Sequence, residues 1–458
     1  MFIPSSTSSS SSSSDKHFQF LDVSGSLQHA RQVVSRNSPH TTPTTIQQPQ
    51  PPLIYSRSAL PLSLISRSDD NYTSLTLSRL ARDQAHVRSL LSRLSFSLSK
   101  HSNQLESPVI SGLKQQSGEY FVRIGIGTPA AEFYMVMDTG SDVSWLQCRP
   151  CVQCYQQSDP IFNPSASSTY APLSCLSRRC IALDFPACFA GRCGYQVIYG
   201  DASFTVGEFA AETISFGSNV SVPNVAIGCG HTNGGLFSGA AGLFGLGGGA
   251  LSLPSQMKAT SFSYCLVNRD SNASSTLDFN STQPADSVEA PLLTNSFVDT
   301  YRYVGLSGIS VGGEPVKFPS SLLEIGRDGR GGVIVDSGTT VSRLRKEVYF
   351  PVRDAFRNMS RNLSYAGEYL LFDTCYDLPS SLSEVRVPEM SFEFGGGKRL
   401  ALPASNYMIP VESGSRKFCF AFAGTLGSLS IIGNVQQQGM RVTYDLANKY
   451  IAFSPNKC

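Results

Sequence analysis

The sequence predicts an all-β protein built from two similar halves. Charged residues make up only 15% of the 458 residues, and the chain holds 39 Gly and 26 Pro, a composition that suits short strands separated by turns. The second observation is a repeat, because 135–146 reads MVMDTGSDVSWL and 333–344 reads VIVDSGTTVSRL. Two such halves facing each other would bring one Asp from each to a shared cleft.

The predicted strands begin after Gly118, where short apolar alternating segments are separated by Gly, Pro, Asn and Asp. They cover 119–127, 133–138, 195–200, 206–216, 222–230, 301–313 and 451–455. A polar stretch at 268–290 separates the halves, so we place the N-terminal half at 118–285 and the C-terminal half at 286–458. About a hundred residues after each Asp comes an apolar-apolar-Gly motif, at 243–245 and at 431–433.

The first 117 residues differ in composition from the rest of the chain. Residues 1–60 are of low complexity, with a serine tract and a Pro/Thr/Gln stretch, and we expect them to lack the apolar surface needed to offset their ordering entropy. Residues 61–117 contain a predicted helix at 79–94. Its apolar face is expected to hold Leu80, Val87, Leu91 and Leu94, with Arg82, Arg88 and Arg93 lying largely away from it.

Charge and cysteine content narrow the function classes. The net charge of +2 offers no electrostatic footprint for nucleic acid, and no apolar run approaches the roughly 18 residues of a membrane span.

Twelve cysteines, all at or after Cys148, indicate disulfides and an oxidising compartment, which means a secreted or vacuolar protein. Six N-x-S/T sequons agree, so a glycoprotein is expected. The Ser-rich start lacks a signal-peptide apolar stretch, which leaves a chloroplast location or an incomplete gene model open.

Asp138 and Asp336 are the candidate catalytic pair. Two carboxyl groups at hydrogen-bonding distance share one proton, so one acts as general base and the other as general acid. A water held between them can attack a carbonyl with no metal, cofactor or covalent intermediate. The neighbouring residues support the pair: Thr139 and Ser337 can hydrogen-bond across the halves, Ser141 and Thr339 can donate to the outer carboxylate oxygens, and Gly140 and Gly338 permit close backbone approach.

The two motifs DTGS and DSGT, each with its later apolar-apolar-Gly partner, resemble those of the pepsin-type aspartic peptidases over about 119–454. CRPCVQC at 148–154, the cysteines at 175–193, IIGNVQQQG at 431–439 and SGEYFVRIGIGTPA at 117–130 are similar to the plant nepenthesin-like and guard-cell branch. The resemblance implies a bilobal fold with its site between two lobes related by a pseudo-two-fold axis. It also implies a monomer that acts as an endopeptidase on peptides or proteins at acidic pH.

The same resemblance assigns further residues. Tyr199 matches the tyrosine of the flap, the hairpin that closes over substrate, and Trp145 matches its hydrogen-bonding partner. The implied disulfides are Cys148–Cys151, Cys154–Cys229, Cys175–Cys193, Cys180–Cys188, Cys265–Cys458 and Cys375–Cys419. Some relatives with this fold are inactive inhibitors or binding proteins, so a catalytically inactive protein remains the alternative function.

Residues 61–117 then correspond to an inhibitory prosegment. Residues 1–107 carry ten Lys/Arg and six Asp/Glu, whereas the remaining chain carries 26 and 28. A basic helix would therefore suit an acidic cleft, with Arg82, Arg88 and Arg93 as candidate partners of the carboxylates and cleavage expected between Ser107 and Gly118.

Three other motifs carry weaker hypotheses. CRPCVQC with the later cysteines could form a zinc site, although no His lies within the cluster. FGLGGGALS lacks the spacing of a dinucleotide loop and is interpreted as a turn. His86, His101 and His231 are expected at the surface or in loops.

Overall fold

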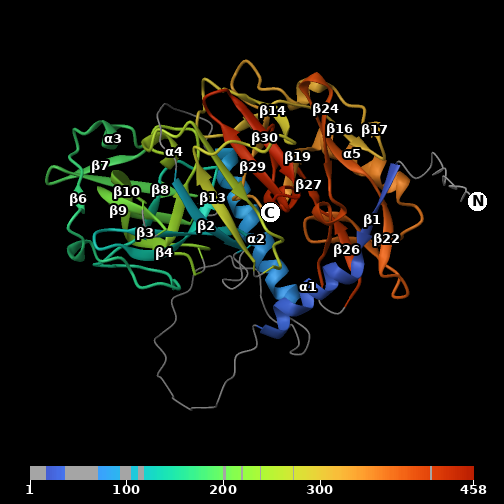
Figure 1. Cartoon of the computed structure of the whole chain (residues 1–458), viewed down its shortest axis with the longest axis horizontal. Coiled ribbons are helices and arrows are strands. Elements are labelled where there is room, and N and C mark those ends of the chain that lie inside the picture. The colour runs from blue at the N-terminus through green and yellow to red at the C-terminus, as the bar shows by residue number, and fades with distance from the viewer. Residues whose placement is uncertain are drawn as a thin grey trace, which may run out of the picture.

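The computed structural model describes residues 17–36, 71–92, 105–111, 118–199, 203–217, 220–237, 239–271, 273–412 and 415–458. Two β-rich halves lie side by side, with helix α2 (Asn71–Ser92) at the region where they meet (Figure 1). The expected all-β architecture is confirmed. Helices other than α2 are α1 (Val23–Arg36), α3 (Arg178–Ile181), α4 (Leu253–Gln256), α5 (Lys346–Met359) and α6 (Asn434–Gln437).

Each strand predicted in the N-terminal half is present. The strands of this half are β3 (Tyr120–Ile126), β4 (Ala131–Asp138), β5 (Trp145–Gln147), β6 (Ala171–Pro172), β7 (Pro186–Phe189), β8 (Arg192–Ile198), β9 (Phe204–Phe216), β10 (Val220–Gly234), β11 (Gly242–Gly245), β12 (Ser261–Cys265) and β13 (Ser274–Phe279). The stretch 268–290 was expected to be polar and without strands, yet it contains β13. Leu277 and Phe279 alternate with Asp278 along β13, so the apolar side chains are buried in the main core.

The C-terminal half adds two four-stranded sheets, ordered β17-β16-β23-β24 and β20-β21-β26-β25. Its strands are β14 (Val288–Leu293), β15 (Tyr303–Val304), β16 (Leu306–Val311), β17 (Glu314–Pro315), β18 (Val333–Val335), β19 (Ser342–Arg345), β20 (Ser364–Tyr369), β21 (Phe372–Asp377), β22 (Glu384–Pro388), β23 (Met390–Phe394), β24 (Lys398–Leu402), β25 (Met408–Pro410), β26 (Lys417–Phe420), β27 (Phe422–Thr425), β28 (Ser430–Ile432), β29 (Met440–Asp445) and β30 (Tyr450–Pro455). Helix α5 buries Val348, Val352 and Phe356, whose spacing places them on one helical face.

A central sheet joins the two halves. Strand β12 of the N-terminal half pairs with β29 of the C-terminal half, and β29 continues to β30 and β14. Strand β2 (Leu105–Ser111) is paired on both sides, with β13 and with β3, and Val109 in it is fully buried. Residues Leu105–Ser111, which precede Gly118 in the chain, are therefore part of this sheet.

The expectation that residues 1–60 have no packed structure is wrong for residues 17–36. Strand β1 (Phe18–Asp22) pairs with β22, and α1 follows it directly. Leu21 and Val23 are buried in the main core cluster, which also contains Val385 and Val387 of β22. Apolar residues within 17–36 thus supply the surface that the low-complexity sequence around them was expected to lack. The rest of 1–60 lies outside the described residues.

All twelve cysteines, each within the described residues, form disulfides, but four of the six implied pairs are wrong. Cys265–Cys458 and Cys375–Cys419 are as expected. The others are Cys148–Cys229, Cys151–Cys154, Cys175–Cys188 and Cys180–Cys193. No thiol is left for the zinc site considered above.

Burial explains the corrected pairing. Cys148 and Cys229 are both fully buried beside the parallel pair β5–β10, whereas Cys151 and Cys154 lie together in the half-buried loop that follows. In the same way, Cys180 on α3 and Cys193 on β8 meet in a buried cluster, while Cys175 and Cys188 remain near the surface. In each of these two regions, the two deeply buried cysteines are bonded to each other and the two shallower ones are bonded to each other.

Among the described residues, none of the helices combines the length and apolar character that a membrane crossing requires.

The two neighbouring disulfides should differ in their effect on stability. Cys148–Cys229 spans 81 residues and Cys151–Cys154 spans 3. Loop-closure entropy predicts a loss of about 4 kcal/mol for the Cys148→Ala/Cys229→Ala double variant and about 1.5 kcal/mol for Cys151→Ala/Cys154→Ala. Urea unfolding followed by the fluorescence of Trp145 measures both. Equal losses for the two variants would contradict the pairing.

Candidate active site

The two candidate Asp residues are placed by equivalent strand arrangements in the two halves. Asp138 ends β4, beside which β11 runs parallel with Leu243 opposite Val136. Asp336 follows β18, beside which β28 runs parallel with Ile431 opposite Ile334. The repeated apolar-apolar-Gly motifs are therefore the strands that support the two Asp loops.

The Gly that ends each supporting motif is required by close backbone approach. A Cβ atom at Gly245 would lie 2.5 Å from the carbonyl oxygen of Asp142, and one at Gly433 would lie 2.8 Å from that of Thr340. Separations this short exclude any side chain unless the Asp loop moves. The same limit applies at Gly338, where a Cβ would lie 2.6 Å from Oδ1 of Asp138. This agrees with the close approach expected from the motif.

The Asp loops are joined by reciprocal hydrogen bonds between Thr139 and Ser337. The amide of Ser337 donates to Oγ1 of Thr139 over 2.9 Å, and the amide of Thr139 donates to Oγ of Ser337 over 3.2 Å. The Ser337 hydroxyl also donates to the carbonyl of Met137. All of these groups are buried, so each bond satisfies a polar atom that water cannot reach. The expected contact between the loops is present.

Each carboxylate is also held by its own loop. Oδ2 of Asp138 accepts from the Ser141 hydroxyl over 2.5 Å, and Oδ1 accepts from the Gly140 amide over 2.9 Å. Oδ2 of Asp336 accepts from both the hydroxyl and the amide of Thr339, over 2.6 and 2.8 Å. These are the contacts expected for Ser141 and Thr339. They fix both carboxyl groups at one buried point between the halves.

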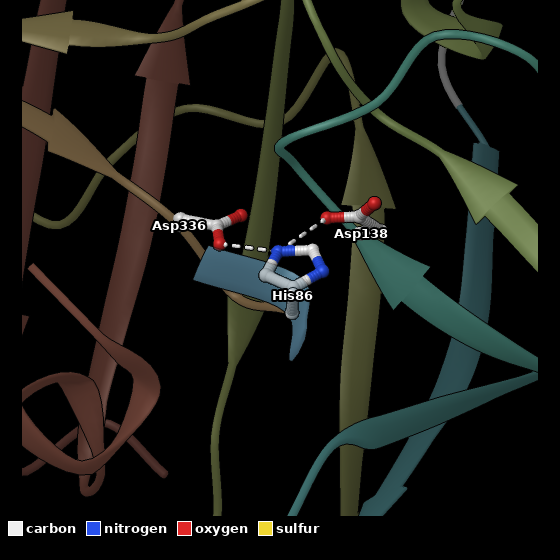
Figure 2. Close-up of side chains that lie close together, drawn as sticks. All are labelled: His86, Asp138 and Asp336. Atoms are coloured by element: carbon white, nitrogen blue, oxygen red, sulfur yellow. Dashed lines mark hydrogen bonds and ion pairs between the residues drawn. The ribbon is translucent and has the colours of Figure 1, made fainter. Parts of the chain in front are cut away.

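The imidazole of His86 lies between the two carboxylates (Figure 2). Its Nε2 donates to Oδ2 of Asp336 over 2.8 Å and is 3.6 Å from Oδ1 of Asp138. His86 comes from α2, and only 11% of its side chain is exposed. The expectation that His86 is a surface or loop residue is therefore wrong. His101 lies outside the described residues. The ring of His231 forms a hydrogen bond with the carbonyl of Pro150, which lies in a loop.

The electrostatics of this triad follow from burial and mutual charge. Burial opposes protonation of His86, but the carboxylates of Asp138 and Asp336 outweigh it and raise the pKa of His86 to about 10. Burial raises the pKa of Asp138, and repulsion from Asp336 adds to this. For Asp336, burial also acts upward, yet the charge and hydrogen bond of His86 hold its pKa below the ordinary value. An imidazolium therefore faces an ionised Asp336.

Two further ion pairs hold α2 against the halves. Arg79 donates to Asp270 of the N-terminal half over 2.9 Å, and all but 2% of its side chain is buried. Asp83 pairs with Arg343 of the C-terminal half and accepts the amide of Thr340 over 2.5 Å. The helix thus contacts both halves through charges on its buried side.

The arginines predicted to face the carboxylates do not do so. Arg88 is exposed and donates to the Gln84 carbonyl within its own helix, and the half-buried Arg82 interacts with Glu119. Arg93 lies outside the described residues. The apolar face is shifted as well, since Leu80, Val87 and Leu90 are buried and Leu91 is only half-buried.

A signal for the correct face was present in the sequence. Arg79, Asp83, His86 and Leu90 follow one another at steps of four, three and four, which defines a single helical stripe. That stripe combines charged and apolar residues, so a pattern search for apolar residues alone does not select it.

The flap contact implied by the resemblance is present. The indole Nε1 of Trp145 donates to the hydroxyl of Tyr199 over 2.8 Å, and Phe237 packs edge-on against both rings. Tyr199 directly follows β8, which pairs with β9 as a hairpin. Residues 200–202 at the turn lie outside the described part of the chain.

His86, Asp138 and Asp336 also have the spacing of a set of metal ligands. Nε2 of His86, Oδ1 of Asp138 and Oδ2 of Asp336 lie within 4.8 Å of one another. The 2.8 Å contact between His86 and Asp336 is that of a charge-assisted hydrogen bond. This hydrogen bond, together with the hydroxyl and amide donors of the two Asp loops, satisfies the carboxylate oxygens, so the geometry does not require a cation.

Comparison with known proteins agrees with this geometry. Family models described as xylanase inhibitor N-terminal and xylanase inhibitor C-terminal match residues 120–280 and 301–455. Aspartyl protease family protein 2 of Arabidopsis thaliana is 50% identical over 395 residues, covering 83% of this chain and 81% of the relative. Aspartic proteinase nepenthesin-2 of Nepenthes gracilis is 40% identical over 397 residues, covering 85% and 88%. The crystal structure of edgp shares the fold, with a TM-score of 0.63, 22% identity and coverage of 78% and 96%.

The charge state of His86 can be tested by NMR of the full chain with ¹³C-labelled histidine. Because the pKa of His86 is raised, the free energy by which its protonated ring stabilises the bound position of α2 is fully present below pH 6.5, the ordinary pKa of His. This stabilisation is lost as the pH rises through about 10. Because the pKa of Asp336 is lowered, the stabilisation from its ionised carboxylate is fully present above pH 3.8, the ordinary pKa of Asp. This stabilisation is lost only as the pH falls below that value. We therefore expect the His86 resonance to stay that of an imidazolium from pH 5 to 8.

The His86→Gln variant identifies the resonance by its disappearance. A His86 titration with a midpoint near the ordinary value would show that the ring does not sit between two carboxyl groups.

Proposed function

The chain belongs to the plant aspartic peptidase family, in its nepenthesin-like branch, and is an aspartic-type endopeptidase; from this we propose that Asp138 and Asp336 activate the water that cleaves the peptide bond. The observation that carries the proposal is the meeting of two buried carboxylates, one from each half, at a single point. Peptides and proteins of the oxidising compartment indicated by the six disulfides are the proposed substrates. We further propose that the enzyme is a monomer, secreted or vacuolar, with a chloroplast location as the alternative.

In the proposed mechanism the pair carries one proton once His86 has left. Asp138, whose pKa is raised by burial and by Asp336, is the proposed acid. Asp336 keeps its charge more readily, because it accepts two amides, those of Gly338 and Thr339, as well as the Thr339 hydroxyl, whereas Asp138 accepts one amide and one hydroxyl.

Asp336 then removes a proton from water as that water attacks the substrate carbonyl, and Asp138 donates its proton to the carbonyl oxygen. The C–N bond of the resulting tetrahedral diol then breaks as Asp336 passes its proton to the departing amine nitrogen and Asp138 takes a proton back from a diol hydroxyl, which restores the shared proton. Tyr199 and Trp145 would close over the substrate.

An inactive binding or inhibitor protein is the second candidate, because the matching family models are described as xylanase inhibitors. The present chain keeps both Asp residues, the hydroxyl donors of both loops and the Trp145–Tyr199 contact. A binding protein has no need of two buried carboxyl groups at one point, so these residues favour the peptidase.

Asn substitution of either Asp tests the mechanism. Asp138→Asn and Asp336→Asn each remove one member of the acid/base pair and keep nearly the same shape, so each should lower hydrolysis of a casein substrate at acidic pH by about 1,000-fold or more. Activity is measured after the N-terminal segment has been removed, with pepstatin as a second check. Substantial activity in both variants would contradict the mechanism. Inactivity of the unsubstituted chain under the same conditions would favour the binding protein.

We propose that the N-terminal residues also keep the enzyme inactive, with His86 as the residue that blocks the carboxylates. A protonated His86 between Asp138 and Asp336 occupies the place where water and the scissile carbonyl must meet. The interval expected to be cut, between Ser107 and Gly118, begins within β2. Because β2 is paired on both sides, a cut there would open the central sheet. We therefore propose cleavage upstream of Leu105, so that β2 stays with the enzyme.

The block should be relieved by His86→Gln in the uncleaved chain. Gln cannot carry the positive charge that holds the His86 ring to Asp336. At pH 5 we therefore expect the variant to hydrolyse a fluorogenic peptide at least about tenfold faster than the unsubstituted precursor. This corresponds to a loss of roughly 1.4 kcal/mol or more from the free energy that holds α2 over the carboxylates. Arg88→Gln is the matched control, because Arg88 lies on the exposed side of the same helix. Gel electrophoresis confirms that the chains remain uncleaved.

Equal activities of the precursor and its His86→Gln variant would show that His86 does not cause the block. Full activity of the uncleaved, unsubstituted chain would exclude inhibition by the N-terminal residues and leave the peptidase proposal standing.

A further inference from the structure

A second interaction of the N-terminal residues lies away from the carboxylates. Strand β1 runs along β22 at the outer side of the C-terminal half, where Figure 1 shows it apart from the region that α2 covers. The two strands are antiparallel in register from Phe18 opposite Pro388 to Asp22 opposite Glu384. Within the described residues, β1 is the only strand that pairs with β22. Without β1, the backbone groups on this side of β22 would form an open sheet edge.

The side chains of β1 and of the residue that follows it alternate between the protein and solvent. Leu21 is 1% exposed and Val23 is fully buried, and both belong to the core cluster that contains Val385 and Val387 of β22. Phe20, directly before Leu21, is 67% exposed, and Asp22, between Leu21 and Val23, is exposed as well. The C-terminal half therefore provides apolar contacts for alternate residues of an extended segment.

Polar contacts specify which segment fits. Gln19 points inward with Leu21 and donates from Nε2 to the Leu402 carbonyl over 2.9 Å and to the Tyr407 hydroxyl over 2.6 Å. At the far end of the strand, the His17 ring bonds the Gly312 carbonyl, and the Glu389 amide donates to the His17 carbonyl over 3.1 Å. The amide side chain of Gln19, two residues before the buried Leu21, thus satisfies the Leu402 carbonyl and the Tyr407 hydroxyl. An apolar residue at this position would leave both groups without this partner.

The segment is continued by a capped helix. The side chain of Asp22 accepts the Gly25 amide over 2.7 Å at the start of α1, and the amide of Val23 donates to the Ser383 carbonyl over 3.0 Å. Farther along α1, Ala30 packs with Tyr72 and Leu75 of α2. Strand β1 is therefore held by the C-terminal half itself, and α1 connects this position to the helix that carries His86.

We propose that the edge of β22 is a peptide-binding site distinct from the catalytic cleft. Its ligand is an extended peptide with Gln, Leu and Val at alternate positions, which residues 17–23 of this chain supply, and these residues stay bound as a separate chain after the connection to α2 has been cut. None of the contacts of β1 is made by Asp138, Asp336 or His86, so the proposal is independent of catalysis.

For the inhibition by α2 proposed above, the binding site at β22 has a further consequence. While residues 37–70 connect the two elements, β1 keeps α2 close to the carboxylates at a high effective concentration. Cutting that connection removes the benefit without displacing β1. Release of α2 then becomes difficult to reverse, although the edge of β22 remains covered.

The test uses the full chain with a recognition sequence for a site-specific protease inserted between Gln50 and Pro51. The chain is folded, cut at pH 7.5 and passed over a size-exclusion column, and mass spectrometry of each fraction locates the fragment that begins at Met1. We expect this fragment to co-elute with the rest of the protein at micromolar concentration.

Two variants of one strand provide the contrast. Leu21→Asp places a charge in the apolar contact and should raise the dissociation constant of the fragment by about 100-fold or more, so that it elutes separately. Phe20→Asp makes the same kind of change at the solvent-exposed neighbouring position and should leave the fragment bound. Near-UV circular dichroism of the uncut chains checks that both variants fold.

If Leu21→Asp does not fold, Gln19→Ala replaces it, with an expected weakening of about fivefold to tenfold from the lost hydrogen bonds. The proposal is overturned if the unsubstituted fragment separates after the cut. It is equally overturned if Leu21→Asp and Phe20→Asp behave alike, because binding would then come from α1 alone.

Discussion

The reciprocal hydrogen bonds between Thr139 and Ser337 are the constraint on which the remainder of the site depends. Two carboxylates repel each other and are costly to bury, so nothing about Asp138 and Asp336 themselves favours their approach. The loops are brought together by neutral amide–hydroxyl bonds one residue farther along, and the supporting strands β11 and β28 fix the loops from behind. The close pairing of the two carboxylates is thus a consequence of backbone architecture.

Once the carboxylates are fixed, their charge determines what may cover them. The helix α2 brings an imidazolium to the pair and places one ion pair on each half, Arg79 with Asp270 and Asp83 with Arg343. Every one of these charges is buried with its partner, so removing either member would leave an uncompensated charge. The helix consequently fits in one orientation, with these charged residues and the buried Leu80, Val87 and Leu90 against the enzyme.

The N-terminal residues use two different kinds of contact. At the cleft the contacts are ionic, whereas at the edge of β22 they are a backbone ladder with Leu21 and Val23 in the core. Disulfides show the same sorting by environment, since Cys148–Cys229 lies in the core and Cys151–Cys154 lies in the half-buried loop beside it. In each case the local surroundings, and not distance along the chain, decide the partner.

The sequence by itself determined the all-β class, the two halves, the Asp pair and its hydroxyl and Gly neighbours, because these rest on local periodicity and on a motif repeated in one chain. Only the tertiary structure decided that His86 rather than Arg82 or Arg88 faces the carboxylates, since this depends on how α2 is rotated against the cleft. It also decided the four disulfides that the family resemblance misassigned and the pairing of β1 with β22. These features depend on depth and on contacts between residues hundreds of positions apart, and neither leaves a periodic signal in the sequence.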